Sequence, residues 1–158
     1  MEPHASPQAG PEIEAEKRRI IEEFSVFDDW VGRYEYIVEL GSNLPNLADS
    51  LKTEANRVLG CQSRVWFVPT VENGRIRFSA DSDAVLVRGL IALLLRIYSN
   101  RTADDILATS PKFFEEIELG SHLTGSRANG LHAMVKRIQA IARETKGKAD
   151  SHASGRKY

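Results

Sequence analysis

Residues 84–98 constrain the fold more than any other part of this chain, because they are apolar around nearly the whole circumference of a helix. A helix that is apolar on all sides must be buried, so the rest of the chain has to pack around it. Arg88 and Arg96 interrupt the apolar run, which is therefore unsuited to crossing a bilayer. We expect residues 84–98 to form the central helix of one folded domain.

A β-hairpin is predicted directly before this helix. Asn73-Gly74 is a strong turn signal, because a type I′ turn needs positive φ at both central residues. The β-branched and aromatic residues at 65–68 suit the first strand, and apolar and polar side chains alternate along the second, 75–80. Because a lone hairpin is marginally stable, we expect a third strand, which residues 54–58 could supply.

Helices are predicted on both sides of the hairpin from apolar periodicity and capping residues. They cover residues 13–24, a segment from Asp28 or Asp29 to about Leu40, short pieces after Thr102 and Ser110, and a long helix from about Ser126. Gly41 is expected to adopt the left-handed conformation that often ends a helix. This order indicates an α+β domain, a small antiparallel β-sheet packed with several helices. Residues 12–145 would form the domain, between a disordered N-terminal segment, 1–11, and a disordered basic tail, 146–158.

Composition and charge exclude several classes of function. The 158 residues carry a formal net charge of −1, which argues against binding to nucleic-acid phosphates. A single cysteine, Cys61, permits no intramolecular disulfide. Residues 1–10 lack the basic and apolar regions of a secretory signal. We therefore expect a cytoplasmic protein with a reduced thiol and with neither a membrane nor a nucleic-acid partner.

Cys61 is the first candidate for chemistry. It follows Gly60 at the junction of a polar connector and a strand, and reactive groups concentrate on loops that leave a rigid scaffold. Arg57 and Arg64 are close in sequence and would favour the nucleophilic thiolate. The alternative is that Cys61 packs as a small apolar residue beside its apolar neighbours.

Other residues offer rival chemistries. A metal site could combine Cys61 with His122, His132, Asp81 and Asp83, although structural zinc and Fe–S sites normally need several thiolates or closely spaced histidines. Cys61 could instead act as the nucleophile of a hydrolase with His122 or His132 as its base. Asp81 and Asp83 could form an acid/base pair, or they could cap helix 84–98.

Arg127 lies at the start of the last predicted helix. It could contact an anion or the carboxylate of a partner, or it could be tied to a local acid such as Asp81. A solvated polar face explains the basic residues farther along this helix, which are Lys136, Arg137, Arg143 and Lys146.

Several blocks of the sequence resemble the SufE family of sulfur acceptors in Fe–S cluster assembly. They are DWVGRYEYIVELG from Asp29, Leu44-Pro45, NRVLGCQSRVW from Asn56, DSDA from Asp81, VRGLIA from Val87, HLT from His122 and SRANGL from Ser126. The blocks extend from about Phe24 to Ala142, nearly the whole expected domain. Arg64 and Gly125 stand where the family usually has Gln and Pro, and neither difference touches the acceptor thiol.

The resemblance implies a SufE/NifU-like (IscU-like) fold, shared with Fe–S scaffold proteins. It implies that Cys61 takes persulfide sulfur from a PLP-dependent cysteine desulfurase of the SufS kind, stimulates that enzyme, and delivers the sulfur to a SufBCD-like scaffold complex. Because PLP would belong to the desulfurase, we expect this chain to hold no cofactor or metal and to show no stand-alone turnover. Related scaffolds present three cysteines, so the single Cys61 indicates a carrier.

The resemblance also implies how the site works. The acceptor cysteine would rest in a shielded position, and a flexible loop would swing it into the site of the partner. Gly60, Gln62 and Ser63 would shape this loop, and Asp81, Asp83, Arg127 and Asn129 would frame the resting pocket or the partner surface. The alternatives are a paralogous sulfur carrier for tRNA or cofactor modification and an Fe–S or metal-binding scaffold.

Overall fold

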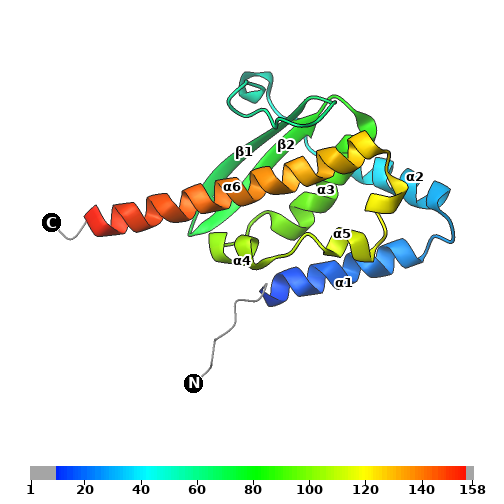
Figure 1. Cartoon of the computed structure of the whole chain (residues 1–158), viewed down its shortest axis with the longest axis horizontal. Helices are drawn as coiled ribbons and strands as arrows, with labels where there is room; N and C mark the ends of the chain where they lie inside the picture. Colours follow the sequence, from blue (N-terminus) through cyan, green and yellow to red (C-terminus); the bar gives the residue numbers. More distant parts are fainter. Residues whose placement is uncertain (1–9, 156–158) are drawn as a thin grey trace.

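The structure is a computed structural model that describes residues 10–155, with no side-chain placement for residues 149–155. Two consecutive strands are preceded and followed along the chain by helices (Figure 1). In order they are α1 (Pro11–Ser25), α2 (Trp30–Ser42), the 3₁₀ turn η1 (Asp49–Leu51), β1 (Val65–Glu72), β2 (Arg75–Ser82), α3 (Val85–Tyr98), α4 (Ala103–Ala108), α5 (Phe113–Glu116), the 3₁₀ turn η2 (Gly120–His122) and α6 (Gly125–Gly155). The predicted α+β class is confirmed.

The hairpin forms as predicted. β1 and β2 are antiparallel, with Val65 opposite Ser82 at one end and Glu72 opposite Arg75 at the other. Asn73 and Gly74 join them with φ values of 53° and 78°, as a type I′ turn requires. Alternate residues of β2 face the core, and the buried ones include Ile76, Phe78 and Ala80.

The expected third strand is reduced to a single bridge. Arg57 pairs with Trp66, and two bonds flank the bridge, from the Val58 N–H to the Val65 carbonyl at 2.8 Å and from the Phe67 N–H to the Asn56 carbonyl at 2.9 Å. The chain is already turning here, because the N–H groups of Asn56 and Arg57 bond to carbonyls three residues earlier. Within residues 10–155 the sheet therefore has two strands.

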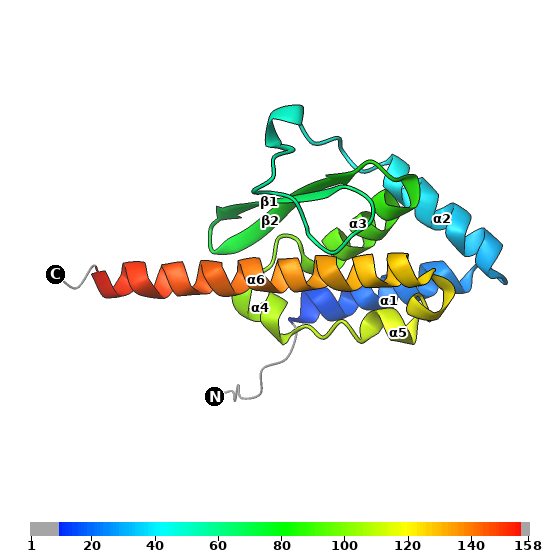
Figure 2. The same cartoon turned by 45° about the horizontal axis from the view of Figure 1, so that its top comes forward.

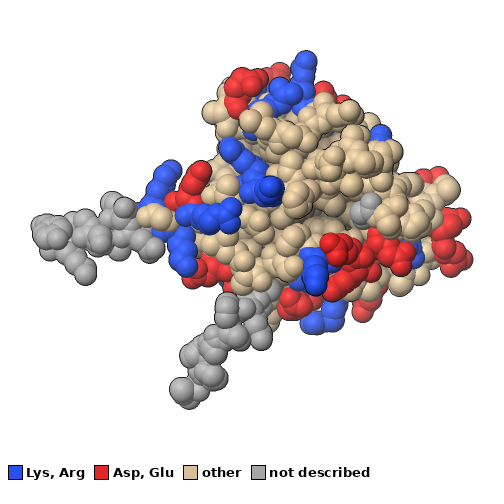
Figure 3. Space-filling view, in the orientation of Figure 1, with Lys and Arg blue, Asp and Glu red and all other residues tan. Residues whose placement is uncertain are grey.

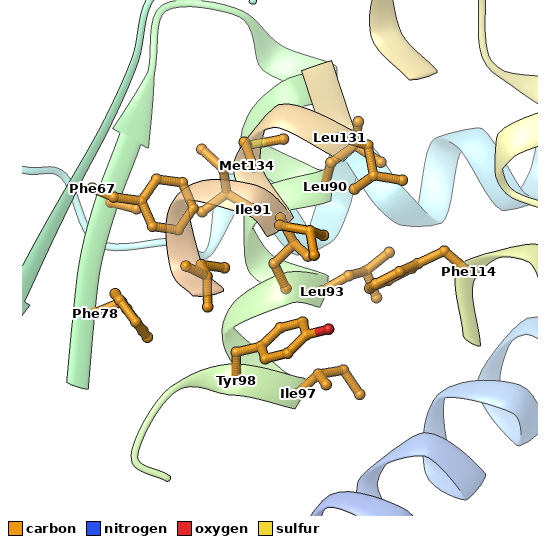
Figure 4. Packing of buried hydrophobic residues seen from close by; sticks show 14 of the residues in the cluster. Phe67, Phe78, Leu90, Ile91, Leu93, Ile97, Tyr98, Phe114, Leu131 and Met134 are labelled. Carbon is orange, nitrogen blue, oxygen red and sulfur yellow. The ribbon is translucent and has the colours of Figure 1, made fainter. Parts of the chain in front are cut away.

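Helix α3 is the centre of the core, as its all-round apolar character predicts. Its most buried side chains are each at most 1% exposed: Leu90, Ile91, Leu93, Leu94, Ile97 and Tyr98. Figure 4 shows what surrounds them: Phe67 and Phe78 from the sheet, Leu131 and Met134 from α6, and Phe114 from α5. Because burial of apolar surface drives folding, α3 organises the core of a fold whose sheet has only two described strands.

Two glycines let α2 and α3 touch at their backbones. A Cβ on Gly89 would lie 2.1 Å from the carbonyl oxygen of Ile37, and one on Gly41 would lie 2.6 Å from the backbone nitrogen of Gly89. The prediction that Gly41 ends its helix in the left-handed conformation is wrong, because α2 continues to Ser42. Gly41 serves the close approach of two helices instead.

The ends of the domain differ from the predicted boundaries. Helix α6 continues to Gly155, so residues 146–155 of the predicted disordered tail belong to this helix, and 156–158 lie outside the described residues. Figures 1 and 2 show the last turns of α6 extending past the body of the molecule. At the other end α1 already begins at Pro11, and residues 1–9 of the predicted disordered segment are not described.

Candidate functional site

Cys61 lies in a short loop that is closed at its base by the hairpin. The Val58 N–H donates to the Val65 carbonyl, which leaves residues 59–64 to bridge between the two. Gly60 has a φ of +94°, a conformation that side chains with a Cβ rarely adopt, and it turns the chain immediately before the cysteine. The sheet therefore fixes where the loop begins and ends.

Asp83 holds the far end of this loop. The Arg64 N–H donates to Asp83 Oδ1 at 3.0 Å, and the Asp83 N–H donates back to the Arg64 carbonyl at 3.3 Å. This carboxylate is exposed, so water weakens the bond relative to a buried one. Asp83 thus holds the Cys61 loop weakly. The prediction that Asp83 caps the next helix is wrong, because the N-cap residue of α3 is Ala84 and, among the described residues, no side chain caps this helix.

The thiol of Cys61 is half-buried against α6. Its Sγ donates a long hydrogen bond to the Gly130 carbonyl at 3.8 Å. A Cβ added to Gly130 would lie 3.7 Å from the same sulfur, an ordinary van der Waals distance, so the thiol rests close to this turn of α6. A thiol is a weak donor, and this contact holds the side chain only lightly.

A cavity of about 340 Å³ opens beside the thiol. The loop and the start of α6 supply its polar lining, and α3 and α6 supply its apolar wall. The lining residues are Cys61, Gln62, Ser63, Val87, Leu90, Thr124, Ser126, Arg127, Gly130 and Met134. Such a mixed chamber has room for one additional sulfur atom on the cysteine.

Burial raises the pKa of the Cys61 thiol, and the positive charge of Arg57 opposes this effect without overcoming it. The predicted effect of the arginines is thus correct in direction for Arg57, which lowers the pKa of Cys61. It is wrong for the net result in the resting loop, where burial raises that pKa more than Arg57 lowers it. Arg64 is exposed and is not among the causes of the shift. The resting thiol is therefore protonated and poorly nucleophilic at neutral pH.

Asp81 has a different role from the predicted one. It is buried, and it accepts hydrogen bonds from the Leu47 N–H at 2.9 Å, the Ser82 N–H at 2.8 Å and the Arg88 guanidinium. Arg88 also donates to the Leu44 carbonyl at 2.6 Å. Burial acts to raise the pKa of Asp81, but these bonds and the charges of Arg88 and Lys52 outweigh it and hold the pKa below its usual value.

This Asp81–Arg88 pair fastens the connector after α2 to the sheet and to α3, and it does not line the cavity. The suggested tie between Arg127 and Asp81 is absent, since Arg127 lies exposed on the rim of the cavity. Asn129 is exposed on α6 and does not line the cavity either. Of the predicted site residues, the structure brings Gln62, Ser63 and Arg127 into the chamber around Cys61, with Gly60 and Asp83 controlling the loop.

Sequence reasoning missed the wall of this chamber. Val87, Leu90 and Met134 belong to stripes that predict only core packing, and nothing in their spacing marks the part that faces the thiol. Gly130 offered a signal, because a glycine in the apolar stripe of a helix usually reflects a close approach. Thr124 and Ser126, at the start of α6, offered none beyond their capping preference.

The two candidate histidines, His122 and His132, lie away from the thiol. His122 stacks on the Trp30 ring, with centroids 4.1 Å apart, and His132 lines a separate cavity between α5 and α6. Neither lines the Cys61 chamber. No cluster of three potential metal ligands occurs in the part of the chain that the structure describes. Likewise, none of the described helices combines the length and apolar character needed to cross a membrane.

Comparison with known proteins identifies the family. The family model for SufE, the Fe–S metabolism associated domain, matches residues 18–142. An uncharacterized SufE-like protein of Rhizobium etli is 44% identical over 130 residues, which cover 79% of this chain and 88% of that protein. One from Rhizobium meliloti is 40% identical over 129 residues, covering 78% of this chain and 92% of the relative.

The fold agrees with this match. The solution structure of a hypothetical protein from Thermus thermophilus superposes with a TM-score of 0.68, covering 82% of this chain and 94% of the other at 24% identity. The region that matches the family model, residues 18–142, includes the Cys61 loop, the hairpin and the part of α6 that faces the thiol. The chain belongs to the SufE family, which is associated with Fe–S metabolism.

Proposed function

We propose that this protein accepts persulfide sulfur on Cys61 from a PLP-dependent cysteine desulfurase of the SufS kind, and stimulates that enzyme. It then carries the sulfur to a SufBCD-like scaffold that builds Fe–S clusters. The observation that carries the proposal is a single, half-buried thiol on a lightly tied loop, facing a chamber that can hold one more sulfur atom. Membership of a family associated with Fe–S metabolism supports it.

The transfer is a thiol–disulfide type exchange. The Cys61 thiolate attacks the outer sulfur of the desulfurase persulfide, a bond forms between that sulfur and Cys61 Sγ, and the bond to the desulfurase cysteine breaks. The desulfurase cysteine leaves as a thiolate and takes up a proton, while Cys61 has given one up. One sulfane sulfur changes carrier and no external oxidant or reductant is consumed.

Movement of the loop would switch the nucleophile on. In the resting position burial raises the pKa of Cys61 and protects the thiol from oxidation. When the loop leaves the chamber, the burial that raises the pKa of Cys61 is lost, and the pKa falls back toward its ordinary value. Exposure and activation are therefore the same event. Arg127, at the rim, is placed to meet an acidic group of the partner.

Mass spectrometry of the intact protein tests the proposal. We expect incubation with cysteine, PLP and a cysteine desulfurase to add one sulfur atom, roughly 32 Da, in a form lost on reduction, as a persulfide must be. The adduct should be absent when the desulfurase is omitted. Peptide mapping should place it on Cys61.

Cys61→Ser is the matched control. The variant should take up no sulfur and should keep the free energy of unfolding of the parent within about 0.5 kcal/mol, because the bond from the thiol to Gly130 is weak. Sulfur found on any residue of the serine variant, or stimulation of the desulfurase by it, would contradict the proposed role of Cys61.

A further inference from the structure

A second groove begins next to the Cys61 chamber. Its volume is about 480 Å³, and its walls are the segment 54–59 and the middle of α6. Leu59 lines the groove and Cys61, two residues later, lines the chamber. On α6 the consecutive residues Ala133 and Met134 face the groove and the chamber respectively. Anything seated in the groove therefore lies beside the loop that carries the thiol.

The groove is basic. Arg57, Lys136 and Arg137 line it, against the one acidic lining residue Glu54. Glu54 pairs with Arg57 at 3.7 Å, which leaves the two α6 cations in excess. Figure 3 shows Lys and Arg gathered over the C-terminal half of α6, while Asp and Glu gather over α1 and α5. The overall net charge of −1 thus conceals a local positive surface.

Arg137 and Lys136 have unused hydrogen-bonding capacity there. Arg137 donates through Nη2 to the Ala55 carbonyl at 3.1 Å, yet its Nε is buried without a partner among the described residues. The side chain of Lys136 is exposed, and no hydrogen bond or ion pair to it is found within residues 10–155. A buried guanidinium nitrogen left unpaired is unfavourable until an acceptor reaches it, so a solvated polar face does not account for Arg137.

The rim of the groove also offers an apolar contact. Leu59 is 81% exposed, an unusual position for a leucine two residues before a reactive thiol. An apolar anchor beside a cluster of cations fits a peptide segment that carries carboxylates next to an apolar side chain. A phosphodiester backbone would need a longer basic track, and the acidic surface over α1 and α5 opposes one.

We propose that this groove docks an acidic segment of the protein that gives sulfur to Cys61. The inference rests on the proposed function and adds where the donor is held: carboxylates meet Lys136 and Arg137, and an apolar residue covers Leu59. Docking there engages the segment that leads into the Cys61 loop, and so brings the donor and the acceptor thiol together.

A synthetic peptide tests the groove without any sulfur transfer. The ¹⁵N-labelled full chain is titrated with an acidic peptide, Glu-Glu-Leu-Glu-Glu, with its glutamine counterpart, and with inorganic phosphate. We expect the acidic peptide alone to shift the amides of residues 54–59 and 133–137. Lys136→Glu should weaken binding roughly fivefold or more, because it reverses a charge within the site. Arg18→Glu, an exposed charge reversal on α1, is the matched control and should leave binding unchanged.

The peptide titration tests the docking inference, and a parallel loading assay tests the proposed function. Shifts elsewhere, equal binding of the glutamine peptide, tighter binding of phosphate, or no effect of Lys136→Glu would overturn the docking inference. Sulfur loading of Cys61 by a desulfurase is measured in parallel on the same samples. Loading without peptide binding would leave the proposed function standing and remove the docking inference. Peptide binding without loading would remove the proposed function and leave the groove as a binding site for acidic peptides alone.

Discussion

Asp81 and Asp83 lie two residues apart, and they hold two regions of the molecule in opposite ways. Asp81 is buried and accepts hydrogen bonds from two backbone amides and from Arg88, which fixes the frame of sheet, α3 and connector. Asp83 is exposed, and its side chain accepts a hydrogen bond from the Arg64 N–H of the Cys61 loop. Bonds to buried charge are strong and bonds at the surface are weak. A rigid frame and a releasable loop can therefore be held by residues of one short segment.

The frame should be the more sensitive region, and Gly89→Ala is its most severe test. The new methyl group would meet the Ile37 carbonyl at 2.1 Å, so α2 and α3 would have to separate along their whole contact. We expect a loss of more than about 3 kcal/mol in the free energy of unfolding, measured by urea denaturation. Gly125→Ala, where nothing lies within 4 Å, is the control and should cost nothing measurable. A tolerated Gly89→Ala would mean that the frame is not rigid.

Arg88→Met comes next in size. It removes the guanidinium from the buried Asp81 carboxylate, which keeps Lys52 at 3.7 Å. It also removes the bonds that Arg88 donates to the carbonyls of Gly41 and Leu44. We expect a loss of about 2 kcal/mol, less than for a fully buried pair because Arg88 is 17% exposed. The rate of Cys61 alkylation in the folded protein should change little. A large rise in the alkylation rate would show that the loop opens only when the frame is also disrupted.

The pH dependence of stability separates Asp81 from the loop. The pKa of Asp81 is below its usual value in the folded protein, so its contribution is present above pH 3.8 and is lost as the pH falls through the folded pKa. Asp81→Asn should therefore be less stable than the parent at pH 7, and the gap should narrow in acid. Glu16 and Glu23, bonded to Arg96, also have lowered pKa values and supply the slope that remains. An unchanged gap at pH 3 would contradict this role.

Asp83→Ala tests the loop itself. Loss of the bond to the Arg64 N–H should cost about 1 kcal/mol at most in global stability, since the carboxylate is exposed. The same loss acts directly on loop opening, so alkylation of Cys61 should become about fivefold faster. Asp28→Ala, an exposed carboxylate between α1 and α2, is the control and should leave the alkylation rate unchanged. Slower alkylation in Asp83→Ala would refute the tie.

Local patterns predict the local parts of this fold. The Asn73-Gly74 turn, the alternation along β2 and the apolar character of α3 each determine a structure within a few residues. The long-range contacts could not be predicted in the same way. Gly41 looks like a helix end because its contact with Gly89 is invisible in sequence, and Asp81 looks like a helix cap because Arg88 and Leu47 meet it only in the fold.

The candidate site divides along the same line. Cys61 and its loop neighbours are adjacent in sequence, so a motif could nominate them together. The chamber forms where α3 and α6 pack against the loop. The same packing buries Cys61 and so determines the net shift of its pKa. A nearby arginine is visible in the sequence, but the degree of burial that outweighs it is not.

Gly130→Ala should have the smallest effect and gives the finest distinction between frame and loop. A methyl group there would sit 3.7 Å from Cys61 Sγ, an ordinary contact that α6 accommodates without moving. Replacing glycine inside a helix should stabilise the fold by about 0.5–1 kcal/mol. Gly147→Ala, on the same helix with nothing within 4 Å, should give a similar gain.

Only Gly130→Ala should also alter the reactivity of Cys61, because its methyl group improves the packing of the resting thiol. Alkylation should slow by about twofold, as a few tenths of a kcal/mol of extra contact imply. If both variants slow alkylation equally, general stability governs access to the thiol and the loop has no separate opening.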